Sequence, residues 1–250
     1  MFLVIRKPWL WGAGLFCCFF LGLAAVLWSG HQTPVAAFST QKEGPITVVV
    51  DPGHGGEDGG AQANGVNEKE INLILARKER LLCQLFGFQV VMTRDDDRSI
   101  HDQQAKTIRE QKTSDLHNRL AIMTSDPGSI AVSIHLNKFP ESYVHGAQVF
   151  YAPGSPGSDI LAETIQRGFC QYLQPDNTRQ IKPADQSLFI LDQNTVTPAV
   201  MVECGFISNP EEAALLQQSH YQDQVAMVIC HSLMKFYHGG EEPVGTENQG

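Results

Sequence analysis

Four side chains of this sequence have the types and positions expected of a hydrolytic metal centre. His54 and His135 each follow an apolar, β-branched run, and Glu203 lies near the end of a third run. Glu68 begins a long helical pattern after a glycine-rich stretch. Two imidazoles and one carboxylate bind Zn²⁺ and leave a fourth position open for water. A bound Zn²⁺ polarises a carbonyl and lowers the pKa of its water to about 7.

A carboxylate that does not bind the metal would carry out the proton transfers. In this interpretation Glu203 takes a proton from the attacking water and delivers it to a leaving amine. The ligands are dispersed along the chain, no H-E-x-x-H motif is present, and Glu70 competes with Glu68 for the ligand position. Spacing alone therefore indicates a metal-dependent hydrolase without selecting its substrate.

Alternating strand and helix patterns explain how these residues could meet. We expect strands over 46–51, 88–93, 130–135, 147–151, 187–191 and 199–204, and helices over 68–86, 114–125, 158–174 and 220–237. Residues 95–113 are expected to form a polar loop, with Ser114 as the N-cap of the next helix. These patterns predict an α/β domain with a mostly parallel, twisted sheet and helices on both faces. Sites in such sheets form beyond the carboxyl ends of the strands, so the predicted residues should share one edge.

The length and charge of the chain limit its organisation and its partners. For 250 residues we expect a membrane anchor at 1–30, a linker at 31–45, one catalytic domain at 46–238 and a disordered tail at 239–250. The formal net charge of −9 argues against nucleic acid as a partner, because binding to a duplex depends on neutralising its phosphates.

The N-terminal segment has the pattern of a transmembrane helix. Residues 9–28 carry no charge, and at about 1.5 Å per residue they would span roughly 30 Å of hydrocarbon. Arg6 and Lys7 precede the span, which predicts an extracytoplasmic catalytic domain. A cleaved signal peptide with a poor site at 35–37 is the alternative, but its apolar core would be unusually long.

Four cysteines follow the predicted anchor: Cys83, Cys170, Cys204 and Cys230. They form no C-x-x-C pair, so no zinc–thiolate knuckle is expected. An extracytoplasmic location permits disulfides. The apolar surroundings of Cys83, Cys204 and Cys230 instead favour thiols that pack as small buried hydrophobic side chains.

Four sequence blocks resemble the zinc-dependent N-acetylmuramoyl-L-alanine amidases of bacterial cell walls. In chain order the blocks are VVVDPGHGGEDGGA, NEKEINL, SIHLN and VECGFISNPEEA, within residues 46–216. The resemblance implies peptidoglycan as substrate, Zn²⁺ as cofactor, and hydrolysis of the amide between muramic acid and L-alanine. It also implies that His54, Glu68 and His135 are the ligands and that Glu203 is the catalytic glutamate. The family's ligand is the glutamate directly before a lysine, which selects Glu68.

The chain is further similar to the germination-specific cortex amidases of spore-forming bacteria. The similarity rests on the single N-terminal anchor, the lack of wall-binding repeats, the MTRDDD run before a polar insert, and FILDQNTVTPAVMVECGFISNP. In that subgroup the enzyme removes stem peptides so that a deacetylase can form muramic-δ-lactam. The resemblance thus implies a role in spore cortex maturation and germination; an accessory envelope protein is an open possibility.

Three further residues are candidates for supporting roles. Asp51 and Asn137 could orient His54 and His135 by hydrogen bonds, or could simply cap turns. Arg119 matches an arginine of the family and could bind a substrate carboxylate or form a structural ion pair.

Two other classes of function stay open on the sequence. Another zinc-dependent wall peptidase would share the metal site but release a different product, and a vegetative wall amidase would act outside the spore. A membrane-anchored binding protein with a degenerate site would lack at least one of the four central residues, and all four are present.

We predict that the mature protein stays in the membrane fraction through residues 1–30. Deleting this segment should move the protein to the soluble fraction, because the apolar span would be gone. Cell fractionation with N-terminal sequencing measures both outcomes. A wild-type protein that begins near Phe38 and is recovered in the soluble fraction would show that the segment is a cleaved signal.

Overall fold

The computed structural model describes residues 45–239 of the chain. The expected anchor at 1–30, nearly all of the linker and all but the first residue of the tail therefore lie outside the described residues. Within 45–239, no helix combines the length and the apolar character that crossing a membrane would require.

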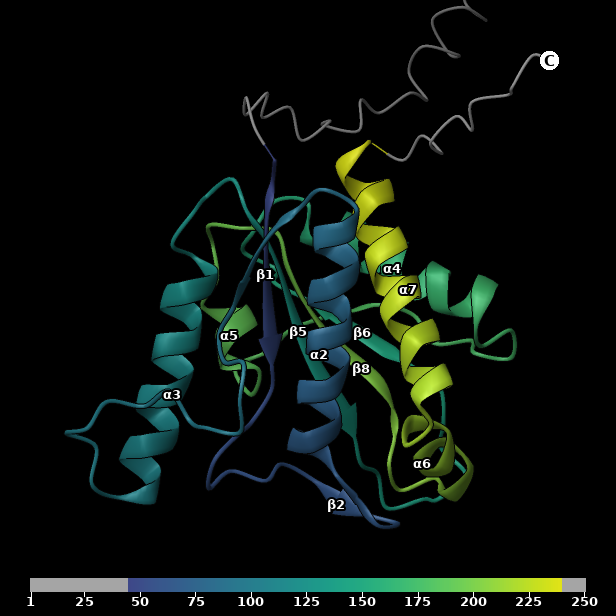
Figure 1. The fold of residues 1–250 in the computed structure, drawn as a ribbon, viewed down its shortest axis with the longest axis horizontal. Coiled ribbons are helices and arrows are strands. Elements are labelled where there is room, and N and C mark those ends of the chain that lie inside the picture. The colour runs from purple at the N-terminus through teal and green to yellow at the C-terminus, as the bar shows by residue number, and fades with distance from the viewer. Residues whose placement is uncertain (1–44, 240–250) are drawn as a thin grey trace, which may run out of the picture. The chain divides into compact units, whose positions relative to one another are not determined.

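A six-stranded sheet forms the centre of the described domain (Figure 1). Its strands are β1 (Thr47–Pro52), β4 (Gln89–Met92), β5 (Ile130–Asn137), β6 (Gln148–Tyr151), β7 (Lys182–Pro183) and β8 (Ala199–Phe206). Their order is β4-β1-β5-β8-β6-β7. The first four strands in this order are parallel, while β6 runs antiparallel to β8 and β7 runs parallel to β6. A small hairpin of β2 (Gln62–Ala63) and β3 (Val66–Asn67) lies outside this sheet.

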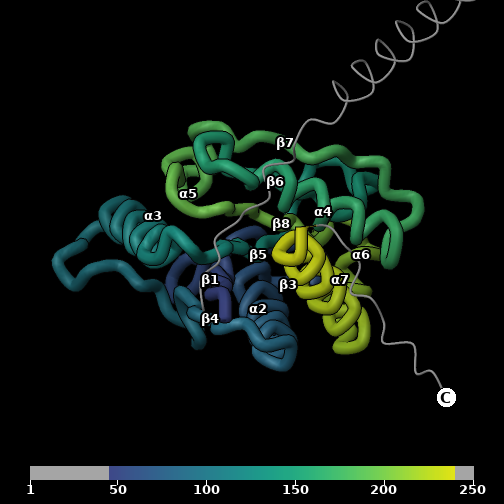
Figure 2. Tube along the Cα trace, turned by 90° about the horizontal axis from the view of Figure 1, so that it is seen from above, coloured from purple at the N-terminus to yellow at the C-terminus, as the bar shows by residue number. Residues whose placement is uncertain are grey.

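Helices cover both faces of the sheet, as the apolar strands predict. The helices are α2 (Glu68–Leu85), α3 (Ile108–Met123), α4 (Ser158–Tyr172), α5 (Phe189–Asp192), α6 (Pro210–Leu216) and α7 (Ser219–Tyr237). Successive side chains of β1 alternate between two cores: Val48 and Val50 pack in the core with α2, α4 and α7, and Val49 in the core with α3 and α5. Figure 2 shows α3 and α5 apart from α2 and α7. The expected α/β class with a helix-flanked sheet is confirmed.

The prediction of a strand over 187–191 is wrong. This segment is a turn followed by the short helix α5, and the side chain of Asp185 starts the turn by accepting bonds from the amide and hydroxyl of Ser187. Ile190 and Leu191 are buried against the sheet. A short apolar run bounded by polar residues fits a buried strand and a buried helical turn equally well, which explains the error.

The helix expected over 114–125 begins earlier, so Ser114 is not its N-cap. Thr107 accepts a bond from the amide of Glu110, and the Glu110 carboxylate accepts one from the amide of Thr107. This reciprocal capping box starts α3 inside the segment expected to be a loop. Residues 95–106 keep the predicted irregular structure, with only short turns.

The register of the parallel strands brings distant residues to one edge. His135 on β5 lies directly opposite Glu203 on β8, and the register shifts just beyond, between His135 and Asn137. The amide of Gly53, after β1, bonds to the carbonyl of Ile134 on β5 at 3.0 Å. The ends of three neighbouring strands therefore present side chains to the same space.

Candidate metal centre and active site

His54, Glu68 and His135 form a compact cluster at this edge of the sheet. One nitrogen from each imidazole and one oxygen of Glu68 all lie within 4.8 Å of one another. Oε1 of Glu68 is 3.2 Å from His54 Nε2 and 3.0 Å from His135 Nδ1. The three residues come from the loop after β1, the first position of α2 and β5. Two nitrogens and one oxygen in this arrangement are a suitable donor set for Zn²⁺.

The backbone and a neighbouring carboxylate fix the direction of the His54 ring. His54 has a φ of 61°, in the left-handed region that few residues other than glycine adopt. Its Nδ1 lies 3.1 Å from Oδ2 of Asp58, and the other oxygen of Asp58 is 3.3 Å from Nζ of Lys112. Because the carboxylate of Asp58 occupies Nδ1, Nε2 of His54 stays available for a metal ion.

Glu68 is held by backbone donors, and two glycines lie against the cluster. Its Oε2 accepts a bond of 2.7 Å from the amide of Ala61, and its Oε1 one of 3.2 Å from the amide of Leu136. A Cβ on Gly60, which has a φ of 67°, would lie 2.6 Å from Oε2 of Glu68. A Cβ on Gly53 would lie 2.2 Å from the ring of His135. Both glycines are thus needed for the backbone to approach the cluster.

The electrostatics of the cluster favour positive charge. Burial lowers the pKa of His54, but hydrogen bonds to Asp58 and Glu68 outweigh it and raise the pKa to about 9. Burial also raises the pKa of Glu68, yet the two imidazoles outweigh this effect and hold it below its usual range. A metal ion at this point would replace protons with its own charge, so the residues present fit a divalent cation.

Glu203 points into the same region but lacks a partner. Its Oε2 is buried and forms no hydrogen bond with any residue of the described domain. Burial raises its pKa to about 7, against the lowering effect of His135. A carboxylate with a pKa near neutrality can both accept and return a proton, which is the property required of a general acid–base group.

A hollow of about 530 Å³ opens beside these residues. His54, His135 and Glu203 line it together with the apolar side chains of Phe189 and Ile190 from α5. The cluster can therefore receive a ligand with both polar and apolar parts.

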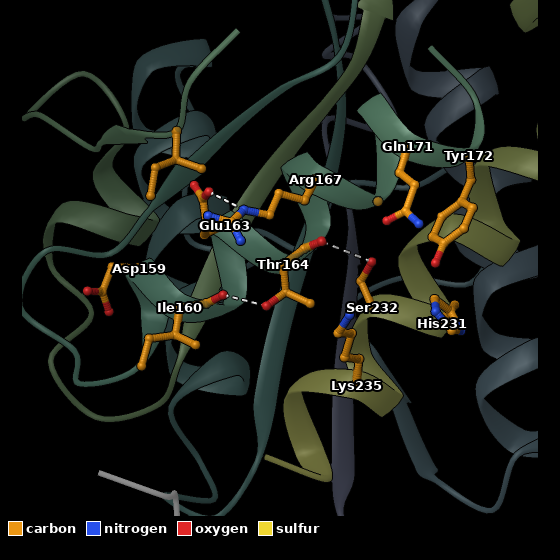
Figure 3. A pocket seen from close by; sticks show the side chains of 12 residues that line it. Asp159, Ile160, Glu163, Thr164, Arg167, Gln171, Tyr172, His231, Ser232 and Lys235 are labelled. Atoms are coloured by element: carbon orange, nitrogen blue, oxygen red, sulfur yellow. Dashed lines mark hydrogen bonds and ion pairs between the residues drawn. The ribbon is translucent and has the colours of Figure 1, made fainter. Parts of the chain in front are cut away.

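A second hollow, of about 550 Å³, lies between α4 and α7 (Figure 3). It contains an ion pair of Glu163 with Arg167, and Ser232 donates to the carbonyl of Thr164. Neither the cluster of His54, Glu68 and His135 nor Glu203 lines this hollow, so the first hollow is the one beside the candidate metal centre.

Arg119 and Asp51 form a buried ion pair, and both residues are among those that line the hollow beside the cluster. Arg119 is 2% exposed, and its Nη1 lies 2.6 Å from Oδ1 of Asp51. The same guanidinium donates to the carbonyls of Pro52 and His54 and to Asp115. These contacts favour the structural ion pair over substrate binding. Asp51 accepts bonds from Arg119 and from hydroxyls rather than from His54, so it affects that ring through Arg119 and the backbone.

The expected role of Asn137 in orienting His135 is not seen. Oδ1 of Asn137 accepts a bond of 2.8 Å from the next amide, that of Lys138, as a local turn cap would. Asp58, the partner of His54, was not among the residues predicted from the sequence. The available signal was a carboxylate four residues after the histidine, within the glycine-rich stretch.

The fold and the site together define an α/β domain with a candidate metal centre at the strand ends. The family described as Amidase_3, N-acetylmuramoyl-L-alanine amidase, matches residues 48–235. The chain therefore belongs to this family of peptidoglycan amidases, and the predicted resemblance is confirmed.

Individual relatives agree with this assignment. The germination-specific N-acetylmuramoyl-L-alanine amidase of Bacillus subtilis (strain 168) is 34% identical over 190 residues, which cover 76% of this chain and 79% of the relative. The CwlD amidase from Clostridioides difficile, solved in complex with the GerS lipoprotein, has a TM-score of 0.74 and 36% identity, covering 78% of this chain and 99% of that one. An N-acetylmuramoyl-L-alanine amidase from Clostridium difficile 630 has a TM-score of 0.67 and 28% identity, covering 79% and 100%.

We predict that Arg119→Leu lowers the free energy of unfolding at pH 7 by about 3–5 kcal/mol, because Asp51 would stay buried without its counter-charge. In the wild type, Arg119 and hydroxyl donors overcome the effect of burial and hold the pKa of Asp51 below its usual range. The wild type therefore loses this contribution as the pH falls through the lowered pKa.

In Arg119→Leu, burial should raise the pKa of Asp51. The variant and the wild type should therefore differ less in their free energy of unfolding as the pH falls from 7 towards 4. Chemical denaturation at several pH values measures this difference. Arg109→Leu, at an exposed arginine of the same helix, is the control and should change stability little. An equal loss of stability in the two variants, or a loss of stability in Arg119→Leu that does not depend on pH, would contradict the assignment of Arg119 as the partner of Asp51.

Proposed function

We propose that this amidase is zinc-dependent and acts on the spore cortex, where it removes stem peptides from muramic acid. The single observation that carries the zinc dependence is the cluster of His54, Glu68 and His135, whose donor atoms lie within 4.8 Å of one another. Similarity to the germination-specific amidase and to CwlD supports the cortex as the target.

In the proposed mechanism, His54, Glu68 and His135 hold the cation at the strand ends. When bound there, Zn²⁺ would acidify a water molecule and polarise the lactyl carbonyl. Asp58 keeps Nδ1 of His54 occupied, and the amides of Ala61 and Leu136 hold the Glu68 carboxylate. These contacts orient the ligands before substrate arrives, so little reorganisation is needed during the reaction.

Glu203 performs the proton transfers of the proposed mechanism. Its carboxylate takes a proton from the attacking water as oxygen bonds to the carbonyl carbon. The same group then gives that proton to the alanine nitrogen as the carbon–nitrogen bond breaks. Without this donation the leaving group would be an amide anion, which is a very poor one. The products are a free lactyl carboxylate and a peptide with a free amino terminus.

Two further elements of the proposal concern location and partners. Residues 1–30 would anchor the catalytic domain to the outer face of a membrane, as their uncharged apolar stretch suggests. The CwlD relative was solved with the GerS lipoprotein, which supports a lipoprotein as accessory partner for this chain as well.

We predict that His54→Ala and His135→Ala each lower the zinc content by about one equivalent relative to the wild type, because each removes one of three ligands. Zinc affinity in the wild type should also fall as the pH is lowered, because protons compete for His54. Elemental analysis of purified protein measures both effects. His220→Ala, at an exposed histidine in the first turn of α7, should keep the wild-type content. Full zinc content in both ligand variants would refute the assignment.

We predict that Glu203→Gln lowers kcat by about 10²–10⁴-fold, or roughly 3–5.5 kcal/mol of barrier, while zinc content and melting temperature hold. The amide keeps the shape of the side chain and removes the base. Mass spectrometry of muropeptides after incubation with cortex peptidoglycan and zinc measures the products. The wild type should produce free muramic acid carboxyl groups and peptides that begin with L-alanine.

Glu211→Gln is the matched control, because this exposed glutamate lies in the first turn of α6. A Glu203→Gln turnover within threefold of the wild type would mean that another group is the base. Release of a terminal amino acid instead of L-alanine-initiated peptides would identify another kind of wall peptidase. Equal rates on cortex and vegetative peptidoglycan would argue against the cortex as the preferred target.

A further inference from the structure

A second group of metal-ligand side chains lies away from the active site, between α2 and α7. These helices run side by side in Figure 1, and their side chains pack in one core. Glu79 and Cys83 come from α2 and Cys230 comes from α7, and their ligand atoms all lie within 4.8 Å of one another. The two sulfurs are 3.9 Å apart, and Sγ of Cys83 is 3.1 Å from Oε1 of Glu79. All three residues are 0% exposed.

Glu79 is the feature that simple packing does not explain. Its Oε2 is buried and has no hydrogen-bond partner within residues 45–239. If Glu79 were protonated on Oε2, the hydroxyl would have no acceptor, and if it were ionised, the carboxylate would have no counter-charge. Burial and the nearby sulfur of Cys230 both raise its pKa well above the usual range. The site therefore lacks a group that accepts electron pairs or brings positive charge.

A disulfide between Cys83 and Cys230 would not supply that group. Its formation would remove the thiol hydrogen that Cys83 donates to Glu79, and the carboxyl would then have no partner at either oxygen. A divalent cation has the opposite effect, because it binds both thiolates and the carboxylate at once.

The separation of the two sulfurs suits a zinc-class ion. With zinc–sulfur bonds of about 2.3 Å in a tetrahedral site, two thiolate sulfurs lie about 3.8 Å apart. The two sulfurs here are 3.9 Å apart. Glu79 could provide both of its oxygens, including the one without a partner, so that three residues supply four donor atoms. Thiolates are also the soft ligands that select zinc over calcium or magnesium.

We propose that Glu79, Cys83 and Cys230 form a second, structural site for a zinc-class cation that fastens α2 to α7. The cation replaces the two thiol protons and the proton that Glu79 carries when neutral, all of which pass to solvent as the site forms during folding, and no electron is transferred. This site does not depend on the proposed catalytic centre. It would act on the reaction only through α2, whose first residue is Glu68.

Cobalt is the probe that separates the two sites. Thiolate ligands give Co²⁺ an intense sulfur-to-metal charge-transfer absorption in the near ultraviolet, whereas imidazole and carboxylate ligands do not. We expect the full chain, freed of metal under reducing conditions and titrated with Co²⁺, to develop this absorption. Wild-type protein should bind about one equivalent more than Cys83→Ser or Glu79→Gln.

Two ligand variants and two control variants serve as comparisons. Cys83→Ser and Glu79→Gln should lose the charge-transfer absorption or most of its intensity, and should melt at a lower temperature after zinc loading than the wild type. Cys204→Ser removes another fully buried cysteine of the same core and should keep the absorption. His54→Ala should also keep it, so that failure of the proposed catalytic centre and failure of this site give different results.

Three results would overturn the proposal. One is a folded wild-type protein that binds Co²⁺ without the absorption, a test that does not depend on any variant folding. Another is a Cys83–Cys230 disulfide in protein isolated without reductant, detected by mass spectrometry. The third is full absorption in both ligand variants.

Discussion

The geometry of the active edge depends on the buried ion pair of Asp51 and Arg119. Three parallel strands end at this edge, and two buried guanidinium groups bind the carbonyls at the end of β1 and in the loop after it. Arg119 takes up the carbonyls of Pro52 and His54, and Arg94 bonds to those of Pro52 and Gly53. The positively charged side chains of Arg94 and Arg119 can be buried close together because Asp51 lies beside Arg119. Backbone oxygens also accept hydrogen bonds from both guanidinium groups. The unusual backbone of His54 is thereby held in place by charge rather than by its own conformational preference.

Much of this arrangement could be predicted from the sequence, because long apolar runs identify buried strands and strand ends identify the site. The class of fold and the family are confirmed, and the structure brings His54, Glu68, His135 and Glu203 to one edge. The failures have local causes. The residues after Asp185 fit two structures equally well, and the capping box at Thr107 lies within a polar stretch that looked like a loop.

Contacts between distant segments could not be predicted from the sequence. Asp58 follows His54 by only four positions, yet its role depends on a turn whose shape the residue types do not fix. Cys83 and Cys230 are 147 residues apart, and only the packing of α2 against α7 brings their sulfurs together. The absence of a C-x-x-C pair argues against a local knuckle, but it carries no information about a site assembled from two helices.

Because Gly53 has no side chain, a substitution that adds atoms at this position would disrupt the site, just as the removal of a functional side chain would. The ring of His135 rests where any side chain at position 53 would begin, at 2.2 Å from the Cβ of an alanine. One added methyl group would push the imidazole away while leaving every ligand in the sequence. A sequence comparison that checks only the candidate ligand residues would not detect this change. The missing side chain at Gly53 is therefore as much a part of the candidate site as the side chains that surround it.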